Sequence, residues 1–136
     1  MNLVLDYNKY NVNNVFFYEP VKNTVMDDSK FIRIIYSDAL IILNGLYLKI
    51  NKIDKKKTDN IDKLLKNIEL LEKNVLNKYN SNKVKITKIK DHLQYLIKKN
   101  ENLDIFILKI SGIWETEQMI GITFKFISNS FYPSVE

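Results

Sequence analysis

The sequence predicts an α+β fold in which a mainly antiparallel sheet receives a two-helix insertion near the middle of the chain. Runs of β-branched and aromatic residues, which are typical of strands, lie within residues 15–50 and again within residues 105–127. Between them, the apolar residues of segment 58–99 recur at steps of three and four, which is typical of amphipathic helices. Strands and helices do not alternate as they do in βαβ units, so most strand pairs are expected to be antiparallel.

Two strands are predicted before residue 40 and two after residue 104. The first pair consists of residues 15–18 and 31–36, which are short β-branched and aromatic runs. The second pair consists of residues 105–113 and 120–127, which we expect to form a hairpin with an irregular loop. Residues 128–136 are expected to be an irregular tail. A single domain comprising residues 1–136 suits this layout, either as an oligonucleotide-binding type of barrel or as an open sheet covered by helices.

A further hairpin is predicted around Asn44-Gly45. This dipeptide separates residues 40–43 from residues 46–50, and it is typical of a type I′ turn because both residues tolerate positive φ. In the second arm, apolar residues alternate with Tyr47 and Lys49, as expected of a strand with one buried and one solvent-facing side. Tyr47 and Lys49 are therefore expected on the solvent side.

The middle segment predicts two helices whose outer faces carry lysines. Thr58 is expected to cap the first helix, because its hydroxyl can accept an N–H of the first turn. The apolar stripe of this helix extends over about five turns and ends before Asn80. Thr87 is expected to cap a second, shorter helix that stops at Asn100. Each helix thus has one face to bury.

The composition explains much of the lysine content without invoking function. The chain contains 20 Lys, 19 Ile and 17 Asn but one Arg. Codons for Lys, Ile and Asn are rich in A and T, so drift in an AT-rich genome accounts for their abundance. The charge is nevertheless placed unevenly, with −1 on residues 1–48, +9 on residues 49–99 and −3 on residues 100–136. The positive excess lies in the predicted helical segment.

Several classes of protein are excluded by the composition. With 46% hydrophobic residues, the chain is too apolar to remain disordered. It has no Cys, which excludes disulfides, thiolate metal ligands and a cysteine nucleophile. The longest apolar stretch, residues 39–43, is far shorter than the roughly 20 residues that span a bilayer. The first six residues do not resemble a secretory signal, so we expect an intracellular protein without a membrane span.

Residues that carry catalytic or metal chemistry are scarce. His92 is the only histidine, and its neighbours give no metal-ligand spacing. The chain contains neither a G-x-S-x-G nucleophile elbow nor a glycine-rich phosphate loop. Asp27-Asp28 and Glu115-x-Glu117 are carboxylate pairs of a kind that usually marks solvated turns. We therefore expect a protein that is not an enzyme and has no catalytic residue, metal site or cofactor.

The features that favour a function concern surfaces. Lysines can follow a phosphate backbone, and exposed aromatic side chains on strands can stack with the bases of a single strand. Tyr47 and Trp114 are the aromatic residues expected to be exposed, and Lys49 and Lys125 alternate with aromatic residues on predicted strands. Further lysines of the predicted nucleic-acid site lie in and before the first helix: Lys55, Lys56, Lys57, Lys63 and Lys66. The near absence of Arg disfavours bidentate readout of bases, so binding would be weakly specific.

Four segments also suggest an origin. They are residues 31–37 (FIRIIYS), 43–47 (LNGLY), 108–116 (LKISGIWET) and 121–126 (GITFKF). These segments resemble parts of small proteins of nucleocytoplasmic large DNA viruses. The resemblance implies a viral protein in the host cytoplasm, at the viral factory, or in the virion. It carries no catalytic motif, and such viruses encode both single-strand-binding proteins and small virion components.

Two functions are therefore open. The first is non-catalytic binding of single-stranded DNA or RNA with little sequence specificity, through the lysines and the strand aromatics. The second is a structural or adaptor role, in which the aromatic sheet face or the apolar stripe of a helix packs against another viral protein. Under the second function the lysines are a solvated helix face enriched by codon bias.

Overall fold

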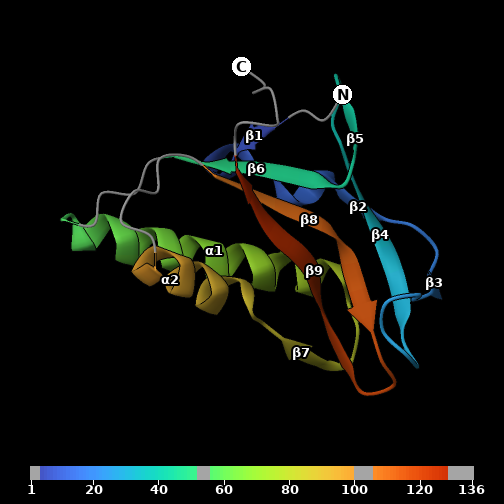
Figure 1. Cartoon of the computed structure of the whole chain (residues 1–136). Helices are drawn as coiled ribbons and strands as arrows, with labels where there is room; N and C mark the ends of the chain where they lie inside the picture. Colours follow the sequence, from blue (N-terminus) through green and yellow to red (C-terminus); the bar gives the residue numbers. More distant parts are fainter. Residues whose placement is uncertain (1–3, 52–55, 100–105, 129–136) are drawn as a thin grey trace.

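The computed structural model describes residues 4–51, 56–99 and 106–128 (Figure 1). The described residues form nine strands, two α-helices and two short 3-10 helices. In chain order these are β1 (Leu5–Asp6), η1 (Tyr7–Lys9), η2 (Val12–Asn14), β2 (Val15–Phe17), β3 (Val21–Lys22), β4 (Lys30–Ser37), β5 (Ile42–Asn44), β6 (Leu46–Ile50), α1 (Thr58–Tyr79), β7 (Val84–Ile86), α2 (Ile89–Lys99), β8 (Phe106–Glu115) and β9 (Met119–Ser128).

Strand β8 organises the sheet because it pairs along both of its edges. One edge pairs with β9, and the other pairs first with β6 and then with β4. Strand β4 extends beyond β8 and continues between β2 and β5. The pairs β1–β6 and β7–β9 are parallel, and the other described pairs are antiparallel. The α+β prediction is thus confirmed, with a mixed and mostly antiparallel sheet that is open and not closed into a barrel.

The hairpin predicted at Asn44-Gly45 is wrong. Strands β5 and β6 do not pair with each other, because β5 pairs with β4 and β6 pairs with β8. Gly45 has φ 96° and donates its N–H to the carbonyl of Ile34 at 2.9 Å. The left-handed backbone at Gly45 therefore redirects the chain from β4 to β8, at the place where these two strands diverge. A Cβ on Gly45 would also lie 3.3 Å from the carbonyl oxygen of Ile110.

Both α-helices pack against one face of the sheet and against each other (Figure 1). The buried stripe of α1 includes Ile68 and Val75, and α2 contributes Leu93. These side chains share one core with alternate residues of β4, β6 and β8: Ile32, Ile34, Leu46, Leu48, Ile50, Leu108 and Ile110. For β6, this agrees with the alternation of Leu46, Leu48 and Ile50 in the sequence. Neither described helix combines the length and the apolar character that crossing a membrane requires.

The ends of the helices are set partly by contacts distant in sequence. Helix α1 begins at Thr58, so Thr58 is its first residue and not the predicted cap, and the side chain of the N-cap residue Lys57 makes no capping hydrogen bond. It ends at Asn80, as predicted, where φ is 58° in the left-handed region. Helix α2 is capped from outside by the carboxylate of Glu72, and Thr87 lies before the cap. Asn100, the predicted end of α2, lies outside the described residues.

Strand β7 lies between the two helices, where the sequence predicts no strand. It pairs in parallel with the start of β9, with Val84 opposite Met119 and Ile86 opposite Gly121. Because β7 has only three residues, its apolar alternation is too short to be distinguished from a loop. The strand extends the sheet beyond β9 and brings the start of α2 to the sheet edge (Figure 1).

Candidate functional site

The face of the sheet opposite α1 and α2, called the far face here, carries the residues of interest. Cross-strand partners point to the same face, so the register arranges them in rows. One row contains Phe31, Trp114 and Gly121, and the next contains Arg33, Gly112 and Thr123. A more distant row contains Tyr47, Lys109 and Lys125. The predicted site residues Tyr47, Trp114 and Lys125 thus share one face, together with Lys49 two residues after Tyr47.

Two glycines form a floor beneath two aromatic rings on the far face. A Cβ on Gly121 would lie 2.3 Å from Cζ2 and 2.5 Å from Cε2 of Trp114. A Cβ on Gly112 would lie 2.7 Å from Cζ of Phe31. The rings therefore lie against the backbone where a side chain is missing, with Phe31 reaching diagonally to Gly112. Trp114 and Phe31 are each half-buried.

These two rings line a cavity of about 660 Å³, called the aromatic cavity here. The loop of residues 23–26 and β3 form one side, and the edge of β9 forms the other. Lys88, which immediately precedes α2, also lines it. The loop side carries apolar side chains that are exposed to solvent, including Val25 at 95%. The cavity has the size of a small-ligand site, for which about 300–1,000 Å³ is usual.

The charges around the aromatic cavity are all of one sign. Its described lining includes the cations Lys22, Arg33 and Lys88 and contains no carboxylate. Within the described part of the chain, none of the three has a carboxylate within ion-pair distance. The guanidinium of Arg33 lies 5.8 Å from the ring centroid of Phe31, a cation–π geometry. Uncompensated cations beside a low-dielectric wall focus a positive potential on the cavity.

The prediction that Tyr47 is exposed is wrong. Tyr47 is 7% exposed and packs with Val4, Ile107 and Ile127 in a small apolar cluster on the far face. The N-terminal segment around Val4 covers this end of the face, because β1 is added beside β6. The ammonium of Lys109 lies 5.6 Å from the Tyr47 ring centroid. Tyr47 therefore belongs to the core of the sheet and cannot stack with a base.

The other predicted site residues are distributed over two sides of the molecule. Lys49 is mostly buried and pairs with Asp6, with Nζ 3.7 Å from Oδ1, whereas Lys125 is exposed on the far face. Four helical-segment lysines are exposed on the side of the sheet that α1 covers, away from Trp114: Lys56, Lys57, Lys63 and Lys66. They therefore do not form one groove with the aromatic cavity. Lys55 lies outside the described residues.

Several other lysines of the basic middle segment serve the fold. Lys73 and Lys90 both pair with Glu69, at 3.4 and 3.2 Å, and these contacts, Lys90 first, hold the pKa of Glu69 below its usual value. Lys78 donates to the carbonyls of Val12 and Asn13 at the end of η2. These three lysines make contacts within the protein, so their ammonium groups are less available to a ligand.

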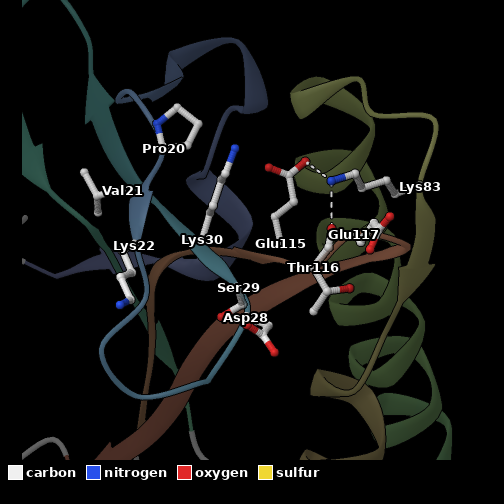
Figure 2. A pocket seen from close by; sticks show the side chains of 10 residues that line it. All are labelled: Pro20, Val21, Lys22, Asp28, Ser29, Lys30, Lys83, Glu115, Thr116 and Glu117. Atoms are coloured by element: carbon white, nitrogen blue, oxygen red, sulfur yellow. Dashed lines mark hydrogen bonds and ion pairs between the residues drawn. The ribbon is translucent and has the colours of Figure 1, made fainter.

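A second cavity, of about 520 Å³, lies at the end of the β8–β9 hairpin (Figure 2). Lys83, which directly precedes β7, contacts the end of β8: its Nζ lies 3.2 Å from Oε2 of Glu115 and donates to the carbonyl of Thr116 at 2.7 Å. The hydroxyl of Tyr79 donates to Oε1 of Glu115 at 3.2 Å, and burial together with this carboxylate raises the pKa of Tyr79. The described lining of this cavity contains equal numbers of lysines and carboxylates: Lys22, Lys30, Lys83, Asp28, Glu115 and Glu117. Lys83 and Glu115 form an ion pair, which suits a structural clasp, and Lys22 lines both cavities.

His92 lies on α2, where its ring is 5.6 Å from that of Phe124 and 5.4 Å from that of Phe126. Both phenylalanines are partly buried against the main core, in agreement with the alternation of β9. Residues 4–51, 56–99 and 106–128 contain no group of three or more His, Asp or Glu that could hold a metal ion. The aromatic cavity is therefore the strongest candidate site.

Apart from Trp114, the aromatic rings and cations of the aromatic cavity are not among the site residues predicted from the sequence: Lys22, Phe31, Arg33 and Lys88. A signal for two of them exists, because the alternation of residues 31–36 places Phe31 and Arg33 on the face opposite Ile32 and Ile34. Lys88 gives no such signal, since its place depends on where α2 begins. Comparisons of the chain with protein-family models, with curated proteins and with solved structures found no match.

Proposed function

We propose that the far face of the sheet binds single-stranded nucleic acid without catalysis and with little sequence specificity. One observation carries this proposal: the aromatic cavity combines two rings lying against glycines with three cations and no carboxylate among its described lining. Aromatic platforms beside a basic groove are the usual means of holding single strands. The proposal moves the site from the lysines of α1 to β3, β4, β8 and the start of α2.

The aromatic rings supply the stacking surfaces. The Trp114 indole lies against Gly121. The indole also lines the aromatic cavity, together with Phe31, Arg33 and Thr123 of the same face. A ring held flat loses little conformational freedom when a base stacks on it, so more of the stacking energy contributes to affinity. Each stacked base contributes about 1–3 kcal/mol. Because every base has a flat apolar face, this contact does not select a sequence.

The cations supply contacts to phosphate. Arg33 lies beside Phe31, and two lysines also line the cavity, Lys22 on β3 and Lys88 just before α2. A strand stacked on the aromatic rings would pass between them with its phosphates facing the lysines. Lys109 and Lys125 continue the same face towards Tyr47 and extend the positive surface. Arg33 is the one arginine in the sequence, so bidentate readout of several bases is not available.

Titration of the protein with a short labelled oligothymidylate tests the proposal. Trp114 is the one tryptophan in the sequence, so its fluorescence should be quenched on binding, and the affinity should fall steeply as salt increases. Arg33→Gln should weaken binding and reduce the salt slope by about 0.7, the value for one single-strand phosphate. Lys66→Gln is the matched control, because Lys66 is exposed on the opposite side of the sheet.

Two outcomes would contradict the proposal. Absence of binding at low salt would exclude the far face as a nucleic-acid site. Equal weakening by Arg33→Gln and Lys66→Gln would indicate attraction to the overall positive charge without a defined site. Trp114→Leu, followed by anisotropy of the labelled oligonucleotide, measures the stacking contribution separately from phosphate contacts.

A structural or adaptor role is the second candidate, and the edge strand β5 favours it. Strand β5 pairs only with β4 in the described sheet, and Leu40 and Ile42 at this edge are 91% and 75% exposed. Exposed apolar residues on an unpaired strand edge are a template for pairing with another chain. Measurement of the mass in solution distinguishes this role, since Ile42→Lys should then reduce self-association while leaving oligonucleotide binding unchanged.

A further inference from the structure

We infer that Glu72 is a positioning residue for the aromatic cavity: its buried carboxylate holds the start of α2 in the place where the Lys88 side chain lines the cavity. This inference rests on the proposed function, because it concerns one of the three cations of that site. It assigns a role in ligand binding to a residue of α1 that does not itself line the cavity.

The geometry links the two residues directly. The backbone N–H of Lys88 donates to Oε2 of Glu72 at 3.0 Å, and the N–H of Ile89 donates to Oε1 at 3.1 Å. Both carboxylate oxygens are therefore used, each by a different N–H of the first turn of α2. The residue exposes only 1% of its surface, and Ile89 beside it is fully buried. The carboxylate cannot turn away without breaking both bonds.

The identity of the cap residue is the second observation. The carbonyl of Lys88 accepts the N–H of His92 at 3.1 Å, so Lys88 occupies the N-cap position of α2. Ser, Thr, Asp and Asn are preferred there because their own side chains accept an N–H of the first turn. A lysine has no acceptor, and its positive charge is unfavourable at the positive end of a helix dipole.

Capping from α1 removes this conflict. Glu72 accepts the N–H groups of the N-cap residue and of the first helical residue, and its carboxylate supplies negative charge at the positive end of α2. The Lys88 side chain is then available to line the cavity, and its backbone is fixed to a helix packed in the core. A fixed cation binds a phosphate at a lower entropic cost than one on a mobile segment.

Neighbouring charges provide the control. Glu69 lies one turn before Glu72 on α1, but it faces solvent and pairs with Lys73 and Lys90. It makes no hydrogen bond to the backbone of α2 among the described residues. Removal of Glu69 therefore changes the local charge by the same amount as removal of Glu72 while leaving the cap intact.

A double-mutant cycle tests the inference with the full chain and a labelled oligothymidylate. Lys88→Gln should reduce the salt slope of binding by about 0.7 and weaken affinity. Glu72→Ala should cause a similar loss, and Glu72→Gln, which keeps one carbonyl acceptor, should cause a smaller one. In the Glu72→Ala/Lys88→Gln variant, affinity should match that of Lys88→Gln alone, because Glu72 acts through Lys88. Glu69→Ala should bind like the wild type.

Each alternative result has a defined meaning. Additive losses in the double variant, or wild-type binding by Glu72→Ala, would overturn the inference. Wild-type binding by Lys88→Gln together with weakened binding by Arg33→Gln would overturn it and leave the proposed function standing. No binding by the wild-type protein would instead refute the proposed function itself. Circular dichroism at the assay temperature identifies a variant that has unfolded, and Glu72→Gln then replaces Glu72→Ala in the cycle.

Discussion

The indole of Trp114 lies over the backbone of Gly121, its direct partner across the β8–β9 hairpin. On the neighbouring strand, Phe31 reaches over Gly112 in a similar way. Two of the three glycines in the sequence are therefore used to seat aromatic rings, and the third makes the bend at position 45. Glycines within the strands leave room for the two aromatic rings to lie against the backbone beside the aromatic cavity.

Replacing Gly121 by Ala should displace the indole. The new Cβ would lie 2.3 Å from Cζ2 of Trp114, so the side chain must leave its present position. We expect the free energy of unfolding to fall by about 1–3 kcal/mol, the usual cost of inserting a methyl group into a packed site. Urea denaturation measures this loss, and a shift of the tryptophan emission reports the movement. Unchanged emission would show that the ring does not lie over Gly121.

Replacing Gly112 by Ala should be more destabilising than the change at Gly121. Here the new Cβ would lie 2.3 Å from the carbonyl oxygen of Ile32, which is part of the β4 backbone. A side chain can rotate away, but a carbonyl in a strand can move only if β4 and β8 separate. The two variants should be compared by thermal unfolding under identical conditions. A higher melting temperature for Gly112→Ala than for Gly121→Ala would contradict this order.

Tyr47→Ala should reduce stability without a specific effect on ligand binding. The side chain is buried among Val4, Ile107 and Ile127, so its removal leaves a cavity. We expect a loss of about 3–5 kcal/mol, as for other large aromatic residues replaced by Ala. Lys125→Ala, on the same face but exposed, should stay within about 0.5 kcal/mol of the wild type. Similar urea midpoints for the two variants would mean that Tyr47 is not buried.

Lys83→Met should loosen the end of the β8–β9 hairpin. The change removes the donor to the Thr116 carbonyl and the cation beside Glu115, whose side chain is only 13% exposed. We expect a cost of about 1–3 kcal/mol, because a largely buried carboxylate loses a charged partner. Lys85→Met serves as the control, because Lys85 is exposed on β7, the short strand that begins directly after Lys83. Faster hydrogen exchange at residues 116–119 in Lys83→Met alone would localise the effect.

The buried carboxylate of Glu72 predicts a pH dependence of stability. Burial is the main cause that raises the pKa of Glu72 above the ordinary value of 4.5, the N–H bonds from Lys88 and Ile89 oppose the rise, and Asp91 and Glu69 add to it. The native state therefore binds this proton more tightly than the unfolded chain does. The stabilisation of the native state by protonated Glu72 is complete below the pKa of this group in the unfolded chain. It is lost as the pH rises through the higher pKa of the group in the native state.

The Glu72→Gln variant cannot titrate at this position. Relative to this variant, the wild type should thus gain free energy of unfolding as the pH is lowered from neutral to about 4.5. Urea denaturation of both proteins across this range measures the difference. The opposite trend, with the wild type losing stability relative to Glu72→Gln on acidification, would show that the N–H bonds outweigh burial.

Local patterns in the sequence were sufficient for the long elements. The apolar stripe predicts α1 and Asn80 predicts its end, because both signals are local; the start differs by one residue, since Thr58 is the first residue of the helix and not its cap. The alternation of β9 likewise predicts its buried side. The Asn44-Gly45 dipeptide marks a bend, but only Gly45 has positive φ, whereas the predicted type I′ turn requires it at both residues. The dipeptide also does not determine the partners of the flanking strands. Pairing depends on which distant strand is adjacent, and no local pattern contains that information.

The candidate site could be predicted only in part, because local patterns indicate the face on which a residue lies but not which distant segments cover it. Alternation puts Tyr47 and Lys49 on the solvent side of their strand, and it puts Lys125 on the side opposite Phe124 and Phe126. Trp114 falls in the predicted loop, whereas β8 extends to Glu115 and the register brings Trp114 to the same face. Alternation does not predict which residues of that face are exposed. The segment around Val4 covers Tyr47, whereas Trp114 lines the aromatic cavity. The exposed helical lysines named above lie on the other side of the sheet.

The sequence by itself determined the α+β class, the two helices and the concentration of lysine in the middle of the chain, since these depend on composition and short-range periodicity. The tertiary structure alone decided which cations gather around aromatic rings: Lys22 and Arg33 come from the paired strands β3 and β4, and Lys88 comes from the start of α2. It also decided that Glu72 caps α2 in place of a local residue. The physical reason is that burial, ion pairing and capping are set by neighbours in space, and strand register and helix packing bring those neighbours together.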